Sequence, residues 1–305
     1  MQRILVAIPH FYDPHSSSTA PTDSTKAGSA EKRAAALTAL ICRLHELFAQ
    51  PVLLAEHSKQ ACTEFAPPDR MGLDIFLITN GDKHLLGQLG CASSLYKQVA
   101  ATGDPPWLGL AAHKLIQQTL GRYDWYCYLE DDTLIEDPLF FEKLRFAHAA
   151  LEKQLGLETL LQPARYETVL DASQHALPAP RKVYLDWECA GMPDFTGPEV
   201  GVEMLGRTWT LEPARHPHAG CFFLDARRAE LFARSKYCGS SEEQWVLPGD
   251  TTATLAVWRT FKLYKPRRDS LAYLEVRHLR PAMLDKLRRV GEGLYTWRKN
   301  WPPPA

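Results

Sequence analysis

The sequence lacks the cysteine spacing of a zinc site or of a disulfide framework. Its seven cysteines lie at positions 42, 62, 91, 127, 189, 221 and 238, with no CxxC pair, and their number is odd. Both features argue against structural zinc and against a secreted disulfide scaffold. We therefore expect a reducing, cytoplasmic setting.

The sequence also lacks long apolar runs and a net charge of either sign. No run reaches the length of about eighteen apolar residues that a membrane-spanning helix needs. The net charge is −1, which gives no general attraction to nucleic acid. Residues 259–299, however, hold twelve Lys and Arg against four acids. This basic end could hold a diphosphate or make peripheral contact with a membrane; the alternative is a solvated face.

Alternating strand and helix patterns fill the first half of the chain. Residues 4–8, 73–79 and 124–129 are apolar runs typical of buried strands, and residues 52–54 are a shorter β-rich run. Helical spacing follows Ser29, which we interpret as an N-cap, and recurs at 110–120 and 140–155. This order predicts an α/β fold with a mostly parallel central sheet.

The second half is less regular. Residues 159–218 are rich in Pro, Gly, aromatic and charged residues, with short strand-like pieces such as 182–185. A buried strand at 220–224, a helix at 226–234 and a helix at 251–261 started by Asp250 follow. We predict one fused domain, with halves 1–158 and 159–305 sharing a sheet.

Three adjacent acids follow the aromatic strand at 124–129. Glu130, Asp131 and Asp132 stand where ligands bind in open α/β sheets, beyond the carboxyl end of a strand. Buried acids need a positive partner, and Mg²⁺ or Mn²⁺ is the simplest one. Since side chains alternate along an extended segment, we expect Glu130 and Asp132 to point one way and Asp131 the other. The alternative is an acidic loop that helps to start the next helix.

The stretch YCYLEDDTLIEDP, residues 126–138, is similar to the EDD variant of the DxD motif in GT-A glycosyltransferases. The resemblance implies a GT-A-like, Rossmann-type α/β/α sandwich with an irregular acceptor-binding half. It also implies a nucleotide-sugar donor, with a UDP-sugar as first choice, and bound Mn²⁺ or Mg²⁺. Asp132 would then hold the metal, while Glu130 and Asp131 would approach the ribose or metal-bound water; Glu130 also counts among the metal ligands.

The resemblance further implies a donor pocket at the end of the first strand. Pro9, His10, Phe11 and Tyr12 occupy this position, and an aromatic ring there could stack on the base. Asn80 ends a second strand and could contact the nucleoside, although Asn-Gly is also a common turn.

Two further roles are implied in the C-terminal half. His278 suits a third metal ligand, with His216 and His218 as rivals. Asp250 suits the base that an inverting enzyme needs, although it would also make a good N-cap. Glu242 and Glu243 are the alternatives for the base. Arg267 and Arg268 could neutralise a diphosphate or lie in a solvated loop.

These features favour a glycosyltransferase acting on a glycan, a lipid-linked or a small-molecule hydroxyl acceptor. The first alternative is a nucleotidyltransferase of similar fold, although residues 10–30 lack the glycine-rich basic loop that grips a triphosphate. The second alternative is a non-catalytic carbohydrate- or partner-binding protein, in which Trp187 and Trp209 would stack on sugars.

Overall fold

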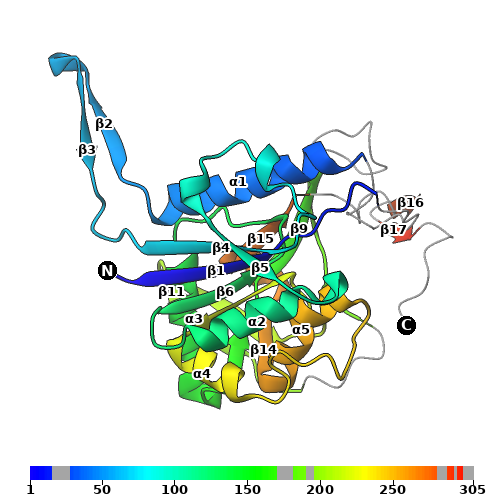
Figure 1. Ribbon diagram of the computed structural model, residues 1–305. Coiled ribbons are helices and arrows are strands. Elements are labelled where there is room, and N and C mark those ends of the chain that lie inside the picture. The colour runs from blue at the N-terminus through cyan, green and yellow to red at the C-terminus, as the bar shows by residue number, and fades with distance from the viewer. Residues whose placement is uncertain (16–27, 170–180, 190–195, 280–286, 292–293, 298–305) are drawn as a thin grey trace.

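A five-stranded sheet forms the centre of the molecule (Figure 1). The computed structural model describes residues 1–15, 28–169, 181–189, 196–279, 287–291 and 294–297. The strand order is β13 (Cys221–Asp225), β6 (Trp125–Leu129), β1 (Arg3–Pro9), β4 (Gly72–Asn80) and β5 (Lys97–Ala101). Three of the pairings are parallel, and β13 runs antiparallel to β6. The predicted mostly parallel central sheet is confirmed.

Helices cover both faces of this sheet because β1 is apolar on both sides. Ile4, Val6 and Ile8 pack into one core cluster with residues of α1 (Ala30–Phe48) and α3 (Phe140–Leu155). Leu5 and Ala7 face the opposite way, toward α2 (Gly109–Gln118), α4 (Ala226–Arg234) and α5 (Pro248–Thr260). The alternation of side chains along a strand produces the two layers. The result is the expected α/β/α arrangement.

Two four-stranded sheets flank this core. One has the order β10 (Arg181–Tyr184), β9 (Ala164–Val169), β15 (Glu275–His278) and β7 (Thr133–Leu134). The other has the order β11 (Val200–Met204), β12 (Arg207–Pro213), β14 (Lys262–Pro266) and β8 (Thr159–Leu161). Residues 159–218 therefore hold more strand than the sequence predicts, because distant β14 and β15 supply the pairing. A separate pair, β16 (Leu287–Gly291) and β17 (Leu294–Trp297), follows.

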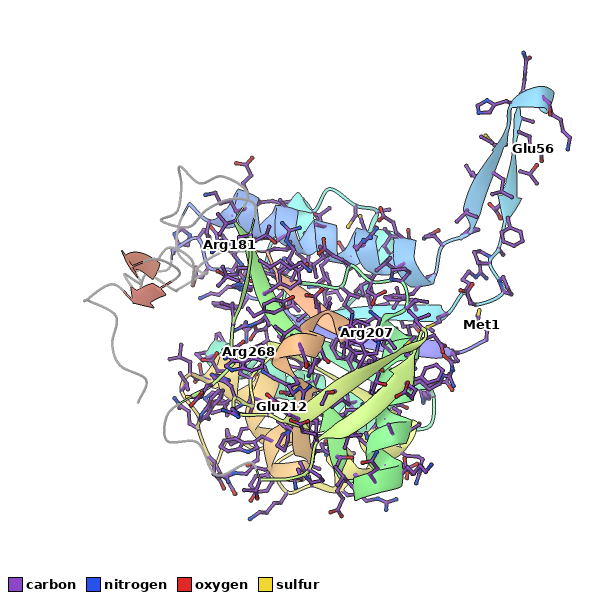
Figure 2. The ribbon with its side chains drawn as sticks, turned by 180° about the vertical axis from the view of Figure 1, so that it is seen from behind. Met1, Glu56, Arg181, Arg207, Glu212 and Arg268 are labelled. Atoms are coloured by element: carbon purple, nitrogen blue, oxygen red, sulfur yellow. The ribbon has the colours of Figure 1, made fainter. Side chains whose placement is uncertain are left out.

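A β-hairpin projects from the body (Figure 1). It consists of β2 (Val52–Glu56) and β3 (Ala61–Phe65), paired antiparallel, and Figure 2 labels Glu56 at its far end. Residues 52–54 are thus a strand, as expected, but they lie outside the central sheet. The fifth strand of that sheet is β5, which the sequence does not predict because KQVAA is mostly polar or small.

The helix starts differ from the expected caps. Helix α5 begins at Pro248 with Leu247 as its N-cap, so the prediction that Asp250 starts this helix is wrong. A proline at the first helical position explains the earlier start. Ser29 does precede α1, but its side chain makes no capping hydrogen bond.

Some predictions fall partly outside the described residues. These are the loop at 10–30, of which 16–27 are not described, and the basic stretch at 259–299, of which 280–286, 292–293 and 298–299 are not. Within the described part of the chain, no helix has the length and apolar character needed to cross a bilayer. The division at residue 158 stays a prediction, although β13 from the second half pairs with β6 from the first.

Candidate functional site

The three acids form a tight turn at the carboxyl end of β6. The Glu130 N–H donates to the Gly220 carbonyl at 2.9 Å, and the Thr133 N–H donates to the Glu130 carbonyl at 3.1 Å. Gly220 has a φ of +66°, and a Cβ there would lie 2.6 Å from Glu130 Oε2. Any other residue would be strained at this φ, and its Cβ would have to displace the Glu130 carboxylate.

Asp131 points into the protein, away from any open surface. Its Oδ2 contacts His10 Nδ1 at 2.6 Å and accepts from the Arg33 guanidinium of α1. Burial would raise the pKa of Asp131, but the Arg33 charge and the bond with His10 hold it well below its usual range. His10 Nε2 in turn accepts from the Leu85 N–H at 3.1 Å. Donor contacts by His10 or Asp131 remain a prediction that requires this network to open.

Asp132 and His278 lie side by side, as expected of a metal-binding pair. Strand β15 pairs with β7 so that His278 lies opposite Thr133, and His278 Nε2 is 3.2 Å from Asp132 Oδ2. His278 Nδ1 is 2.8 Å from Glu167 Oε1, a fully buried carboxylate. Burial would lower the pKa of His278, but Asp132 and Glu167 outweigh burial and raise it to about 9.

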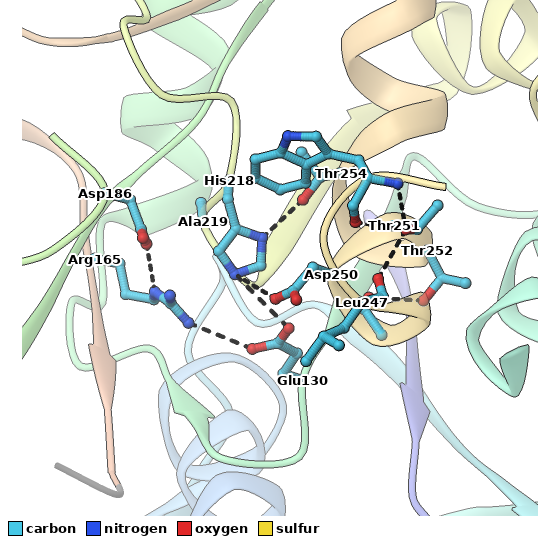
Figure 3. A network of polar contacts seen from close by, with 12 residues as sticks. Glu130, Arg165, Asp186, His218, Ala219, Leu247, Asp250, Thr251, Thr252 and Thr254 are labelled. Carbon is cyan, nitrogen blue, oxygen red and sulfur yellow. Dashed lines mark hydrogen bonds and ion pairs between the residues drawn. The ribbon is translucent and has the colours of Figure 1, made fainter. Parts of the chain in front are cut away.

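Glu130 faces a second group of polar side chains (Figure 3). Its Oε2 is 3.4 Å from Arg165 Nη1, and Arg165 Nε donates to Asp186 at 2.7 Å. Its Oε1 is 3.9 Å from His218 Nε2, which is itself 3.8 Å from Asp250 Oδ1. Burial raises the pKa of Glu130 to about 7; Arg165 opposes this rise, while Asp132 and Asp250 add to it. Burial also raises the pKa of Asp250 and keeps that of His218 well below 6.5.

The remaining predicted donor contacts are dispersed. Pro9 ends β1, and Phe11 packs against the apolar cluster that Leu5 and Ala7 form with α2, α4 and α5. Tyr12 is buried in a small apolar cluster with Ala34. Asn80 lines a cavity of 550 Å³ with Trp107 and others, and its side chain donates to the Gly103 carbonyl. Asn80 thus lines a cavity, whereas Phe11 and Tyr12 pack in apolar clusters.

The alternatives in the C-terminal half are distributed as follows. Glu243 pairs with Arg259 at 3.1 Å, and Glu242 is exposed. His216 Nε2 lies 4.0 Å from Asp186, at the edge of the Arg165 network. Arg267 pairs with Glu199 and Asp269. The structure thus brings Glu130, Asp132, Asp250, His218 and His278 to one region and leaves Glu243 and Arg267 in pairs of their own.

No model of a known protein family and no curated protein matches this chain. Among solved structures, one similar protein is the mannose-1-phosphate geranyltransferase of Thermus thermophilus, which is 12% identical to this chain. The match covers 87% of this chain and 74% of that chain, with a TM-score of 0.33. Another is a putative glucose-1-phosphate thymidylyltransferase of Bacillus anthracis in complex with a sucrose, which is also 12% identical. This match covers 72% of this chain and 78% of that chain, with a TM-score of 0.28. Both bear the names of transferases. Similarities this weak carry no argument about the chain's activity.

Three functional candidates were not found from the sequence. Arg165 and Glu167 lie two residues apart on β9, and Asp186 follows β10 with a φ of +53°. Two ionisable residues at i and i+2 in a strand point to the same face, which is a signal that sequence alone offers. Their partners, however, come from distant segments and depend on the pairing of β9 with β15.

Proposed function

We propose that this protein is a metal-dependent glycosyltransferase that moves a sugar from a nucleotide-diphosphate donor to a hydroxyl acceptor. The observation that carries the proposal is the arrangement of Asp132, His278 and Glu167 at the carboxyl end of β6. A carboxylate and an imidazole that face each other at 3.2 Å are ligands that Mn²⁺ accepts. A buried carboxylate behind the imidazole is the usual support of a metal-binding histidine.

The residues fit such an ion. Asp132 and His278 Nε2 would hold it, and Glu167 would keep His278 in orientation. A divalent cation bound there would neutralise the charge that develops on a leaving diphosphate. This role requires His278 to lose the proton that Asp132 now favours, so metal binding would release a proton.

The neighbouring residues support the same reaction. Arg165 is nearly buried and carries its charge beside Glu130, where it could stabilise an anionic leaving group. Asp250 stands in the first turn of α5 with a raised pKa, which brings its carboxylate closer to the range of an effective general base. In an inverting reaction, Asp250 would take the proton of the acceptor hydroxyl.

The second candidate is a nucleotidyltransferase of similar fold. A carboxylate and an imidazole that could hold a divalent cation would serve this reaction as well, so the pair Asp132 and His278 does not distinguish the two reactions. The third is a non-catalytic carbohydrate-binding protein. The released product separates all three: a nucleoside diphosphate, pyrophosphate, or neither.

The decisive experiment follows the products with Mn²⁺ and a panel of nucleotide sugars, and in parallel with nucleoside triphosphates plus sugar 1-phosphates. We expect release of a nucleoside diphosphate, with a loss of at least about 100-fold in Asp132→Asn or in excess EDTA. Asp137→Asn, at the other end of the acidic stretch, is the matched control and should retain activity. Full activity of Asp132→Asn, or pyrophosphate as the product, would refute the proposal.

A further inference from the structure

Three side chains from separate elements converge beside the proposed donor-metal site. Glu130 follows β6, His218 precedes β13, and Asp250 lies in the first turn of α5 (Figure 3). One ligand atom of each lies within 4.8 Å of the other two. We infer that Glu130, His218 and Asp250 form a divalent-cation site that shares no ligand with the Asp132–His278 pair.

The His218 ring is held in the orientation of a ligand. The residue is 4% exposed, and its Nδ1 lies 2.7 Å from the Thr254 hydroxyl of α5. Its Nε2 is aimed between the two carboxylates, at 3.9 Å from Glu130 Oε1 and 3.8 Å from Asp250 Oδ1. These separations exceed hydrogen-bond length, and no closer partner of Nε2 occurs among the residues that the structure describes. The Nε2 atom of a buried imidazole thus faces two carboxylates across a gap.

The width of this gap fits an ion. With metal–ligand bonds of about 2.0–2.2 Å, neighbouring ligand atoms in a tetrahedral set lie about 3.3–3.6 Å apart. The two separations from His218 Nε2, 3.8 and 3.9 Å, are only a few tenths of an ångström wider, and all three ligand atoms lie within 4.8 Å of one another. Small rotations of the two carboxylates, both of which are partly exposed, would close the set without moving His218.

The ligand atoms indicate which ions would bind. One imidazole and two carboxylates suit Mn²⁺ or Zn²⁺, whereas Ca²⁺ and Mg²⁺ prefer oxygen alone. Arg165 forms an ion pair with Oε2 of Glu130, so Oε1 is the oxygen that faces His218. A Thr254 hydroxyl on the far ring nitrogen supplies the outer hydrogen bond that metal-binding histidines usually have.

This site has a consequence for Asp250. An ion bound there would occupy the Asp250 oxygen that faces His218, so the carboxylate would act as a metal ligand whenever the site is filled. The inference does not rest on the proposed glycosyl transfer, because it concerns metal binding to the protein without nucleotide or sugar.

The test counts Mn²⁺ bound to the full chain by equilibrium dialysis and follows the titration by calorimetry, with no nucleotide present. We expect His218→Ala and Asp250→Asn each to bind one ion fewer than the wild-type protein. The control His45→Gln removes a histidine of α1 whose ring contacts the Leu95 carbonyl, and it should bind as many ions as the wild type. Circular dichroism checks that each variant is folded. Asp250 is partly exposed, so we expect Asp250→Asn to fold and to test the site even if His218→Ala does not fold.

Unchanged ion number and affinity in both His218→Ala and Asp250→Asn would overturn the inference. The inference would also be overturned if His278→Ala bound one ion fewer than the wild type while His218→Ala bound as many. That result would still support a metal site at Asp132 and His278. Loss of one ion in His218→Ala, together with no transferase activity of the wild type, would support this site and reject the proposed function. The two proposals can therefore fail separately.

Discussion

The charge of His278 links the stability of the site to pH. Its folded-state pKa of about 9 lies above the ordinary value of 6.5, so its ion pair with Asp132 stabilises the fold fully below pH 6.5. This contribution is lost as the pH rises through 9. We expect the difference in melting temperature between wild type and His278→Gln, both in EDTA, to be largest below pH 6.5, to narrow between pH 6.5 and 9, and to be small above pH 9. A constant difference across this range would contradict the assignment.

Gly220 is the second residue whose replacement has a predictable outcome. Its φ of +66° makes any other residue strained, and a Cβ would meet the Glu130 carboxylate at 2.6 Å. Gly206 has nearly the same φ, +69°, but a Cβ at that residue would meet no atom within 4 Å. Gly206→Ala should therefore cost about 1–2 kcal/mol of stability from strain alone.

Gly220→Ala should cost more than Gly206→Ala and should also displace Glu130, with loss of activity that Gly206→Ala does not show. Chemical denaturation measures the stability of both variants, and the product assay measures their activity. Equal losses of stability in the two, with activity retained in both, would show that the space beside Glu130 is not critical.

Among the secondary-structure elements, the β2–β3 hairpin forms a two-stranded sheet of its own, outside the core. Leu53 is 68% exposed and Phe65 46%, and Glu56 at its tip stands far from the body (Figure 2). Two strands without a third have little stability of their own in water. We expect replacement of residues 52–65 by a short Gly-Ser linker to leave the melting temperature of the body nearly unchanged. A large drop, measured by scanning calorimetry, would show that the hairpin supports the core.

The elements differ in how well their sequences predict them. Helices α3 and α4 occupy the predicted residues because their apolar spacing is regular and local. The same holds for β1, β4 and β6, whose apolar runs are buried on both faces of the sheet. Strand β5 was not predicted, because KQVAA carries no strong apolar pattern and is fixed by its pairing with β4. Local patterns therefore predict the core, whereas edge strands depend on their neighbours.

For the molecule as a whole, part of the candidate site can be predicted from the sequence. The acids could be located because an apolar strand leads directly into them, and His278 because a strand-like run precedes it. The link between Glu130 and Arg165, by contrast, joins residues 35 positions apart through the packing of different sheets. Such contacts follow from the relative placement of sheets, on which short-range periodicity carries no information. Asp250 illustrates the same limit, since Pro248 rather than Asp250 sets the start of α5.

Strand β15 has a consequence for how the protein matures. It places His278 opposite Thr133, and it is the last strand in chain order of the flanking sheet formed by β10, β9, β15 and β7. Because synthesis proceeds from the N-terminus, every strand of the central sheet leaves the ribosome before this histidine does. The nascent protein thus contains every strand of the central sheet before it contains His278. In the proposed function, an ion could therefore be held by Asp132 and His278 together only after all strands of the central sheet have been synthesised.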